Sequence, residues 1–241
     1  MKVYLHYTIW NKAAHVPRLM EGVADCIPKG SSIDIVFDNC TDSSLHNFHL
    51  VKKKYLAGYK VREFESTKKF RWPNTNDAIK RFLHSDCDIF LSPQDDQKLQ
   101  DRHLIDNLMK VPESGIIGMR DGVDNGQYWS SNFSRGTEKT IWLKSGEFQK
   151  VTFVNDGPIA LHRSTILKVG EFDERYWAHY ADNDYSHRCE ELDLENYVMG
   201  AEVIHEKWDC KTCGALIPSE VWSDEFSKHD YNIYKKKWLL K

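Results

Sequence analysis

Hydrophobic and polar positions follow two different periods along the first half of the chain. From Val3 to Ile9, apolar side chains occupy every second position, which predicts a half-buried β-strand. Over residues 16–23 the apolar positions are three and four residues apart, which predicts one face of a helix. The same two patterns recur, with strands expected at 33–37, 59–64 and 88–91 and helices at 48–55, 78–83 and 104–109. Repeated strand–helix units predict a mostly parallel central sheet flanked by helices on both faces.

The second half of the chain is less regular. Residues 122–146 are rich in Gly, Ser and aromatic residues, including Trp129 and Trp142, and predict a long loop or hairpin of the kind that shapes a binding site. Further along we expect a strand at 158–161, a short helix capped by Ser164, a helix at 180–192, strands at 197–199 and 202–205, and a helix from Ser219. No repeat or linker divides the sequence, so we expect one α/β domain over residues 1–215 and a C-terminal helical extension at 216–241.

Composition and charge exclude several classes of protein. The chain has 241 residues, of which 41% are hydrophobic and 29% charged, and its net charge is −3. These values do not fit a disordered or fibrous protein, and they argue against binding nucleic acid through overall charge alone. No apolar run approaches the roughly 20 residues that cross a bilayer, and the N-terminus lacks the apolar core of a signal peptide. We therefore expect a cytoplasmic protein without a transmembrane segment.

Six cysteines are present, and two of them, Cys210 and Cys213, form a lone C-x-x-C pair. Without a secretory signal, free thiols are favoured over a disulfide framework. A structural zinc site needs four ligands, and only His205 lies near this pair in the sequence. An ordinary pair of thiols is therefore favoured over metal binding.

Two common nucleotide-binding motifs are absent from the sequence. It has neither the G-x-G-x-x-G of dinucleotide-binding domains nor the G-x-x-x-x-G-K-[ST] of P-loop proteins, which argues against a dehydrogenase or a P-loop ATPase. Ligands of mostly parallel sheets bind beyond the carboxyl ends of the strands. That rule selects two acidic loops, at 38–44 and 92–96.

Both acidic loops have a functional and a structural interpretation. Asp95 and Asp96 follow a buried strand, where two carboxylates suit a hard divalent cation, although Asp is also common in solvated turns. A carboxylate at Asp38 or Asp42 can accept hydrogen bonds from a ribose or a base, and Asp42 or Ser43 can equally cap the next helix. The loops alone do not decide between these alternatives.

A longer pattern occupies the second half of the chain. It consists of Phe153-Val-Asn-Asp-Gly-Pro-Ile-Ala-Leu-His-Arg163, Val169-Gly-Glu-Phe-Asp-Glu174, Asp182-Asn-Asp184, Arg188 and Val203-Ile-His205. This order resembles that of the family 2 glycosyltransferases. Upstream, the family's nucleotide-contacting loop resembles Asp38-x-x-x-Asp42, and a variant of its metal motif resembles Leu91-Ser-Pro-Gln-Asp95-Asp96.

The resemblance covers residues 3 to about 205 and has two departures. Pro93 replaces the first acid of the metal motif, and Ala181 stands where an acid usually precedes the catalytic aspartate. Both departures concern the metal site and its surroundings more than the assignment.

The resemblance implies a single GT-A (Rossmann-like) domain, with a donor half at about 1–115 and an acceptor half at about 116–215. It implies an inverting glycosyltransferase, either a hexosyl- or a pentosyltransferase, that uses Mn²⁺ or Mg²⁺. The donor would be a nucleotide diphosphate sugar, UDP- or dTDP-linked, and the acceptor a hydroxyl of a saccharide or glycolipid.

Roles for individual residues follow from the same resemblance. Asp182 would be the general base on the acceptor hydroxyl, which gives single displacement with inversion. Asp95 and Asp96 would bind the metal, and His205 would be a further ligand or a diphosphate contact, unless it is an ordinary histidine at a strand end. The donor site would also include Asp38, Asp42 and Asn76. We expect Asn76 before the helix that precedes the metal strand, where it can alternatively cap that helix.

The acceptor side is less well defined. Asp184 is expected to contact or support the acceptor, and Arg188 is expected to be structural. Trp129 and Trp142 can stack on a sugar or fill a core beneath the long loop.

Two other functions remain open at this point. The first is the same transfer onto a hydroxylated base of modified, phage-type DNA, for which a basic strip at 52–71 offers some support, although a solvated surface is the favoured interpretation. The second is a non-catalytic module that binds sugar nucleotides. Retention of Asp95, Asp96, Asp182 and His205 in one chain argues against this module.

Overall fold

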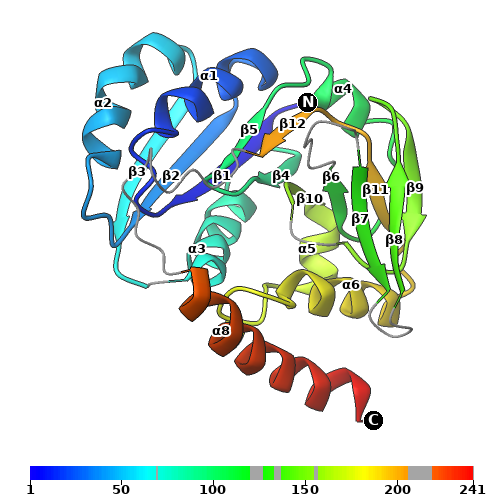
Figure 1. The fold of residues 1–241 in the computed structure, drawn as a ribbon. Helices are drawn as coiled ribbons and strands as arrows, with labels where there is room; N and C mark the ends of the chain where they lie inside the picture. Colours follow the sequence, from blue (N-terminus) through cyan, green and yellow to red (C-terminus); the bar gives the residue numbers. More distant parts are fainter. Residues whose placement is uncertain (69, 120–126, 133–136, 155–156, 206–218, 241) are drawn as a thin grey trace.

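A large mixed sheet runs through the molecule, and helices cover both of its faces (Figure 1). The computed structural model describes residues 1–68, 70–119, 127–132, 137–154, 157–205 and 219–240. The strands of the large sheet are β1 (Val3–Ile9), β2 (Ser32–Asp38), β3 (Lys60–Ser66), β4 (Ile89–Ser92), β6 (Ile117–Met119), β9 (Phe148–Val151), β10 (Ile159–His162) and β11 (Asn196–Met199). Two smaller pairs join β5 (Gln97–Leu99) to β12 (Val203–His205) and β7 (Gln127–Asn132) to β8 (Thr137–Trp142).

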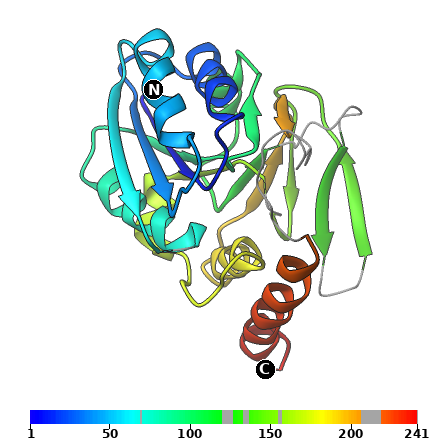
Figure 2. The ribbon, with the colours of Figure 1, turned by 60° about the vertical axis from the view of Figure 1, so that its left-hand side comes forward.

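The helices alternate with the strands in the first half and gather below the sheet in the second (Figure 2). They are α1 (Val16–Cys26), α2 (Ser44–Tyr55), α3 (Arg71–Leu83), α4 (Leu104–Leu108), α5 (Arg163–Val169), α6 (Ala181–Glu191) and α8 (Ser219–Tyr234), and α8 continues into a π-helical turn, η2 (Lys235–Leu239). In the described part of the chain, no helix is long and apolar enough to cross a membrane.

The strand order of the large sheet is β3-β2-β1-β4-β10-β6-β11-β9. Neighbours from β3 to β4 are parallel, whereas β10 is antiparallel to both β4 and β6, and β9 is antiparallel to β11. The predicted fold class, a mostly parallel α/β sheet flanked by helices and followed by a C-terminal helix, is therefore confirmed.

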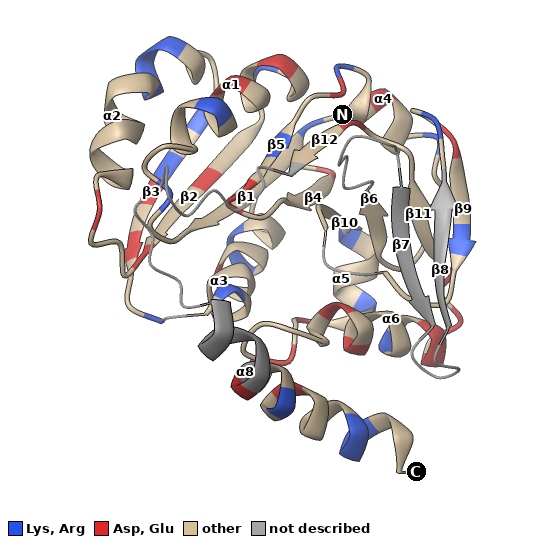
Figure 3. Ribbon diagram, viewed as in Figure 1, with Lys and Arg blue, Asp and Glu red and all other residues tan. Residues whose placement is uncertain are grey.

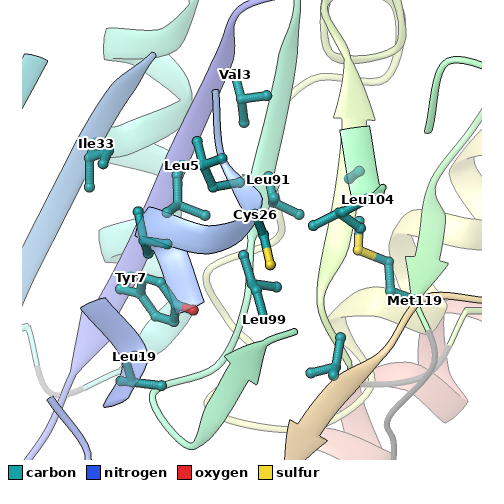
Figure 4. Close-up of a cluster of buried hydrophobic side chains, with 14 of the residues drawn as sticks. Val3, Leu5, Tyr7, Leu19, Cys26, Ile33, Leu91, Leu99, Leu104 and Met119 are labelled. Carbon is teal, nitrogen blue, oxygen red and sulfur yellow. The ribbon is translucent and has the colours of Figure 1, made fainter. Parts of the chain in front are cut away.

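Two hydrophobic cores lie on opposite faces of the sheet. Alternate residues of β1, such as Leu5 and Tyr7, face the first core, and Figure 4 shows them in one cluster with Leu91 of β4 and Leu99 of β5. Tyr4, one residue before Leu5, belongs to the second core with α3, α5 and α6. Alternating apolar residues thus serve one core each, as expected for a central strand between two helical layers.

The prediction that β1 is half-buried is wrong. His6, a polar position of the alternation, is fully buried, and its Nε2 lies 3.0 Å from Oγ1 of Thr8. Burial lowers the pKa of His6 to about 3, so this histidine is neutral inside the protein. The physical reason is the position of β1 between β2 and β4, where both faces of the strand are covered.

Two predicted helix starts are also wrong. Asn76 lies inside α3 instead of before it, since the helix begins at Arg71 and accommodates Pro73 in its first turn. Ser164 lies inside α5, where His162 is the residue before the helix. The prediction also lacked β5, β6 and β9, which have only three or four residues and carry little periodicity of their own.

Helix α1 crosses β5 so closely that Gly22 has no room for a side chain. A Cβ atom there would lie 2.5 Å from the carbonyl oxygen of Leu99. Because that oxygen belongs to the backbone of a strand, no change of rotamer relieves the clash.

We predict that Gly22→Ala destabilises the protein by about 1–3 kcal/mol, as overpacked cores do. Helix propensity alone predicts the opposite sign, because Ala is about 1 kcal/mol better than Gly inside a helix. Urea unfolding followed by circular dichroism measures the difference, and Ala24→Gly on the same helix is the control for propensity. A Gly22→Ala variant more stable than the wild type would contradict the close crossing of α1 and β5.

Candidate functional site

The loops that follow β1 and β2 are tied to each other by side chains. Asn11 has a left-handed backbone with φ of 50°, and its Oδ1 accepts the backbone N–H of Thr41 at 2.8 Å. Asp42 accepts the backbone N–H of Ala13 through Oδ2 and that of Ser44 through Oδ1, both at 2.9 Å. These bonds join the two loops at the edge of the sheet where the parallel strands end, which we call the carboxyl edge.

Both predicted donor contacts of the β2 loop lie at the carboxyl edge. Asp38 is the last residue of β2 and is buried, with 3% of its surface exposed. The described hydrogen bonds of Asp42 serve the loops themselves, in agreement with its capping interpretation. A contact of either residue with a donor stays a prediction.

The carboxyl edge carries an acidic pair directly after β4. Asp96 is buried, and Nζ of the buried Lys12 lies 3.8 Å from its Oδ2. Oδ2 of Asp95 accepts the backbone N–H of Trp10 at 2.9 Å, so the loop after β1 contacts both acids. Burial and the charge of Asp96 raise the pKa of Asp95 to about 6, although Lys12 opposes the shift.

Two observations show that a divalent cation fits this pair. A raised carboxyl pKa indicates negative charge that the surrounding groups leave partly uncompensated, and a cation with oxygen ligands would compensate it. In addition, Oγ of Ser92, three residues before Asp95, is buried and has no hydrogen-bond partner among the described residues. The hydroxyl of Ser92 is an oxygen donor of the kind that Mg²⁺ and Mn²⁺ accept.

His205, the third predicted metal ligand, is brought near the pair by strand register. In the antiparallel pairing of β12 with β5, His205 lies opposite Gln97. Gln97 is the residue that follows Asp96 in the chain. The side chain of His205 lies outside the described part of the structure. Among the described side chains, no group of three or more His, Cys, Asp or Glu residues could bind a metal ion, so the role of His205 stays a prediction.

Asp182, the predicted base, lies in the first turn of α6 and is 3% exposed. Its Oδ1 accepts the backbone N–H of Asn183 at 2.9 Å, and its backbone carbonyl accepts the hydroxyl of Ser186 at 2.8 Å. A short turn connects the end of α6 to the start of β11, and β11 and β6 run in the same direction as β4. Helix α6 therefore begins toward the carboxyl edge, where the acidic pair lies.

Ring contacts support this placement of α6. Arg71 donates to the backbone carbonyl of Ser92 at the end of β4, at 3.0 Å. The preceding residue, Phe70, stacks on Trp177 with a centroid distance of 5.5 Å and an interplanar angle of 2°. Trp177 is five residues before Asp182, so the start of α3 connects the end of β4 to the loop before α6.

Asp184 has a different environment from the one expected for an acceptor contact. It is fully buried, and its oxygens lie 3.0 Å from Nε of Arg188, 2.8 Å from Nε1 of Trp238 and 2.6 Å from Nζ of Lys237. Arg188 also donates to the backbone carbonyl of Val169 at 3.0 Å. These contacts support the expected structural role of Arg188 and tie Asp184 to the C-terminal segment.

The remaining predicted site residues are placed as follows. The amide of Asn76 is buried and bonds both the N–H and the carbonyl of Phe172, each at 2.9 Å, so it connects α3 to the segment after α5 and does not cap α3. Trp129 and Trp142 lie on β7 and β8, which confirm the predicted hairpin, but only the backbone is described there. Cys210 and Cys213 lie outside the described residues.

Sequence reasoning missed three residues that the structure brings into or beside the site. Trp10 and Lys12 directly follow β1, so the strand-end rule that selected the acidic loops could have selected them as well. Asp230, on α8, contacts the loop before α6. Nothing local in the sequence indicates that contact.

Comparisons with known proteins identify the fold. No protein family matches the chain, and no curated protein sequence is similar enough to count as a relative. Many solved structures are similar to it, and they include the following three. TarS of S. aureus has a TM-score of 0.61 at 16% identity, over 84% of this chain and 36% of TarS, and a structure of TarS 1–349 contains UDP-GlcNAc.

The other two structures contain Mn²⁺. The mannosyltransferase PcManGT of Pyrobaculum calidifontis, with GDP-Man and Mn²⁺, has a TM-score of 0.59 at 14% identity, over 83% of this chain and 56% of that one. GalNAc-T7, with UDP, GalNAc and Mn²⁺, has a TM-score of 0.64 at 11% identity, over 100% of this chain and 52% of that one. The chain thus has a GT-A-like glycosyltransferase fold and spans about a third to three fifths of the length of these proteins.

We predict that Asp95→Asn stabilises the metal-free protein at pH 8 by about 1–3 kcal/mol. Since the folded state raises the pKa of Asp95, ionisation of this group opposes folding, fully above pH 6 and not at all below the ordinary pKa of an aspartate. Asn removes the charge and keeps an oxygen for the N–H of Trp10. Urea unfolding in chelator at several pH values measures the effect.

The difference between Asp95→Asn and the wild type should disappear near pH 3, where both side chains are neutral. The control is Asp25→Asn, which removes the same charge from an exposed position of α1. An Asp95→Asn variant that is less stable than the wild type at pH 8 would show that the carboxylate is well compensated.

Proposed function

We propose that the protein is a metal-dependent, inverting glycosyltransferase that moves a sugar from a nucleotide diphosphate sugar to an acceptor hydroxyl. One observation carries the proposal. An acidic pair after β4, of which Asp96 is buried and Asp95 partly buried, and a buried aspartate in the first turn of α6 lie toward the same edge of a sheet with a glycosyltransferase fold. Transfer from such a donor needs both a charge-neutralised leaving group and a base for the acceptor.

The donor would bind over the loops after β1 and β2. Their mutual hydrogen bonds fix the backbone before any ligand arrives, which reduces the entropy lost on binding. Asp38 at the end of β2 would accept hydrogen bonds from the nucleoside, and Lys12 lies where it could meet a diphosphate beside Asp96. UDP-GlcNAc and GDP-Man in the similar structures support a nucleotide sugar, and we propose a UDP- or dTDP-linked one.

Asp95 and Asp96 would bind Mn²⁺ or Mg²⁺, with His205 as a further ligand. The metal would supply positive charge to the diphosphate as it leaves. Mn²⁺ is present in two of the similar structures, which supports this cofactor. The chain's own contribution is to place two carboxylates side by side in a buried setting where charges interact strongly.

Asp182 would accept the proton of the acceptor hydroxyl as that oxygen attacks the anomeric carbon. The bond to the leaving nucleotide diphosphate breaks on the opposite face, so the configuration inverts in a single displacement. Because the carboxylate oxygen Oδ1 is held by the N–H of Asn183, the side chain has a defined orientation at the start of α6.

For the acceptor, the charges of the surface favour a saccharide or glycolipid over DNA. Figure 3 shows Lys and Arg along α2 and α3 and Asp and Glu on the neighbouring strands. Several cations of the basic strip face acidic partners, in the pairs Lys52–Glu63, Lys60–Asp86, Arg62–Asp34 and Lys68–Asp77. Lys69 lies outside the described residues. Cations that already pair with acids offer little net charge to a phosphate backbone.

Donor binding should depend on a divalent cation. We predict that removing the metal with a chelator weakens donor binding at least about 10-fold, because the diphosphate then meets the acidic pair without compensation. Calorimetry with UDP-GlcNAc, UDP-glucose and GDP-mannose, in Mn²⁺ and in EDTA, measures the effect.

Two variants sharpen the metal test. Asp96→Asn should lose the dependence on Mn²⁺, whereas Asp106→Asn, at an exposed position of α4, should keep it. Equal affinity in Mn²⁺ and in EDTA for every donor that binds would remove the metal from the proposal.

Asp182→Asn should leave donor affinity within about two-fold of the wild type while lowering turnover by about 100-fold or more, the range for loss of a general base. Turnover is measured as nucleotide release with the donor that calorimetry selects, and as product mass in a screen of saccharide acceptors. Glu191→Gln on the same helix is the control and should keep turnover. Substantial residual turnover in Asp182→Asn would show that another group is the base.

A further inference from the structure

The C-terminal segment makes polar contacts with the helix that carries Asp182. We call five of its residues the C-terminal clamp: His229, Asp230, Tyr234, Lys237 and Trp238. Figures 1 and 2 both show α8 lying alongside α6. Clamp contacts reach α6 and the loop before it at three points.

The first point is the carboxylate of Asp230, which is fully buried. Its Oδ1 accepts the backbone N–H of Trp177 at 3.0 Å, and its Oδ2 accepts those of Ala178 at 2.8 Å and His179 at 2.7 Å. Nδ1 of His229 lies 2.8 Å from Oδ1 as well. Three successive N–H groups that converge on one carboxylate fix the path of the loop, because each bond is strengthened by the charge.

The second point is the residue between this loop and α6. Tyr180 has a left-handed backbone with φ of 62°, a conformation that costs energy for any residue with a side chain. Its ring stacks on that of Tyr234, with centroids 5.1 Å apart. The clamp thus contacts the strained residue that sets where α6 begins.

The third point is Asp184, which lies two residues after Asp182 on α6. Nε1 of Trp238 donates to its Oδ1 at 2.8 Å, and Nζ of Lys237 lies 2.6 Å from the same oxygen. Trp238 also stacks on His187, whose Nε2 lies 2.7 Å from the hydroxyl of Tyr234. Asp182 therefore stands between two segments that the clamp fixes, the loop at 177–179 before it and the first turns of α6 after it.

A stack of rings connects the clamp to the start of α3. The ring of His229 stacks on that of Trp177 with centroids 3.5 Å apart, and the ring of Phe70 stacks on the same Trp177 with centroids 5.5 Å apart. The next residue, Arg71, donates to the carbonyl of Ser92 at the end of β4. Trp177 therefore connects the clamp to the start of α3 through two stacked rings.

We propose that Asp230 is a positioning residue for Asp182. By fixing the loop at 177–179 it sets the position of the base relative to the acidic pair after β4, with Trp238 and Lys237 fixing α6 from the other side. The inference rests on the proposed function, because it assigns a purpose to the position of Asp182. The hydrogen bonds described for the loops after β1 and β2 join these loops to each other and to Asp95, so we expect donor affinity to be independent of the clamp.

The test compares turnover with donor affinity in the full chain carrying Asp230→Asn. Asn keeps the shape and one accepting oxygen but loses the charge and one acceptor. Turnover, measured as nucleotide release from the donor selected by calorimetry, should fall about 10- to 100-fold, as misplacement of a reacting group does. The donor dissociation constant should change less than about two-fold.

Two further variants separate positioning from loss of folding. Trp238→Phe keeps a ring on His187 and removes only the N–H that donates to Asp184, so it should lower turnover in the same direction with donor affinity unchanged. Glu225→Gln, at an exposed position of α8, is the matched control and should match the wild type. Turnover is normalised to the folded fraction from urea unfolding.

The outcomes are distinguishable. If Asp182→Asn loses turnover and Asp230→Asn keeps it, the positioning role is overturned while the proposed function stands. If turnover and donor affinity fall together in Asp230→Asn, the residue supports the fold in general, which also overturns the role. Should Asp182→Asn keep turnover, the proposed base is wrong, and the positioning role fails with it.

Discussion

Burial of carboxylates is the constraint on which the rest of this structure depends. An isolated buried carboxylate is so costly that it persists only with partners. Asp34 meets this condition with Arg62 and Arg81, at 2.8 and 2.7 Å, and Asp230 meets it with three backbone N–H groups. The acidic pair after β4 differs, because burial leaves Asp95 with a raised pKa even with Lys12 nearby. Where compensation is complete the acid supports the fold, and where it is incomplete, as at Asp95, the uncompensated charge is what the proposed cation would neutralise.

The directions of the strands bring the buried acids of the two halves of the chain to one edge of the sheet. Parallel strands bring the ends of β2 and β4 to one edge, and the antiparallel β10 reverses direction so that the second half of the chain is back at the same edge where α6 begins. The two acidic centres therefore come from parts of the chain about 90 residues apart, yet strand direction alone brings them to one side. Sequence reasoning could reach that far, because the periodic segments and the acids that follow them are local signals.

The sequence did not predict contacts between residues that lie far apart in the chain. Asn76 is a short polar residue near a helix start, and the donor-contact and capping interpretations were both reasonable from its neighbours. Its actual partner, Phe172, is 96 residues away in the chain. Asp184 likewise has its partners at the C-terminus, 54 residues away in the case of Trp238. The buried His6 was hidden for a related reason, since only the strand order shows that both faces of β1 are covered. Residues satisfied across the fold carry no sign of their partners in the local pattern.

The two centres are supported by separate sets of contacts, and this separation has a consequence for specificity. The donor side depends on hydrogen bonds among the loops after β1, β2 and β4, whereas the first turn of α6 depends on α8 and η2. Bonds that share no partner change independently, so alterations in the C-terminal segment can shift the acceptor side while donor contacts stay intact. The ring of Trp177 and the guanidinium of Arg71 are the described connection between the two sides. Under the proposed function, this arrangement would allow one way of binding the donor to be combined with different acceptors.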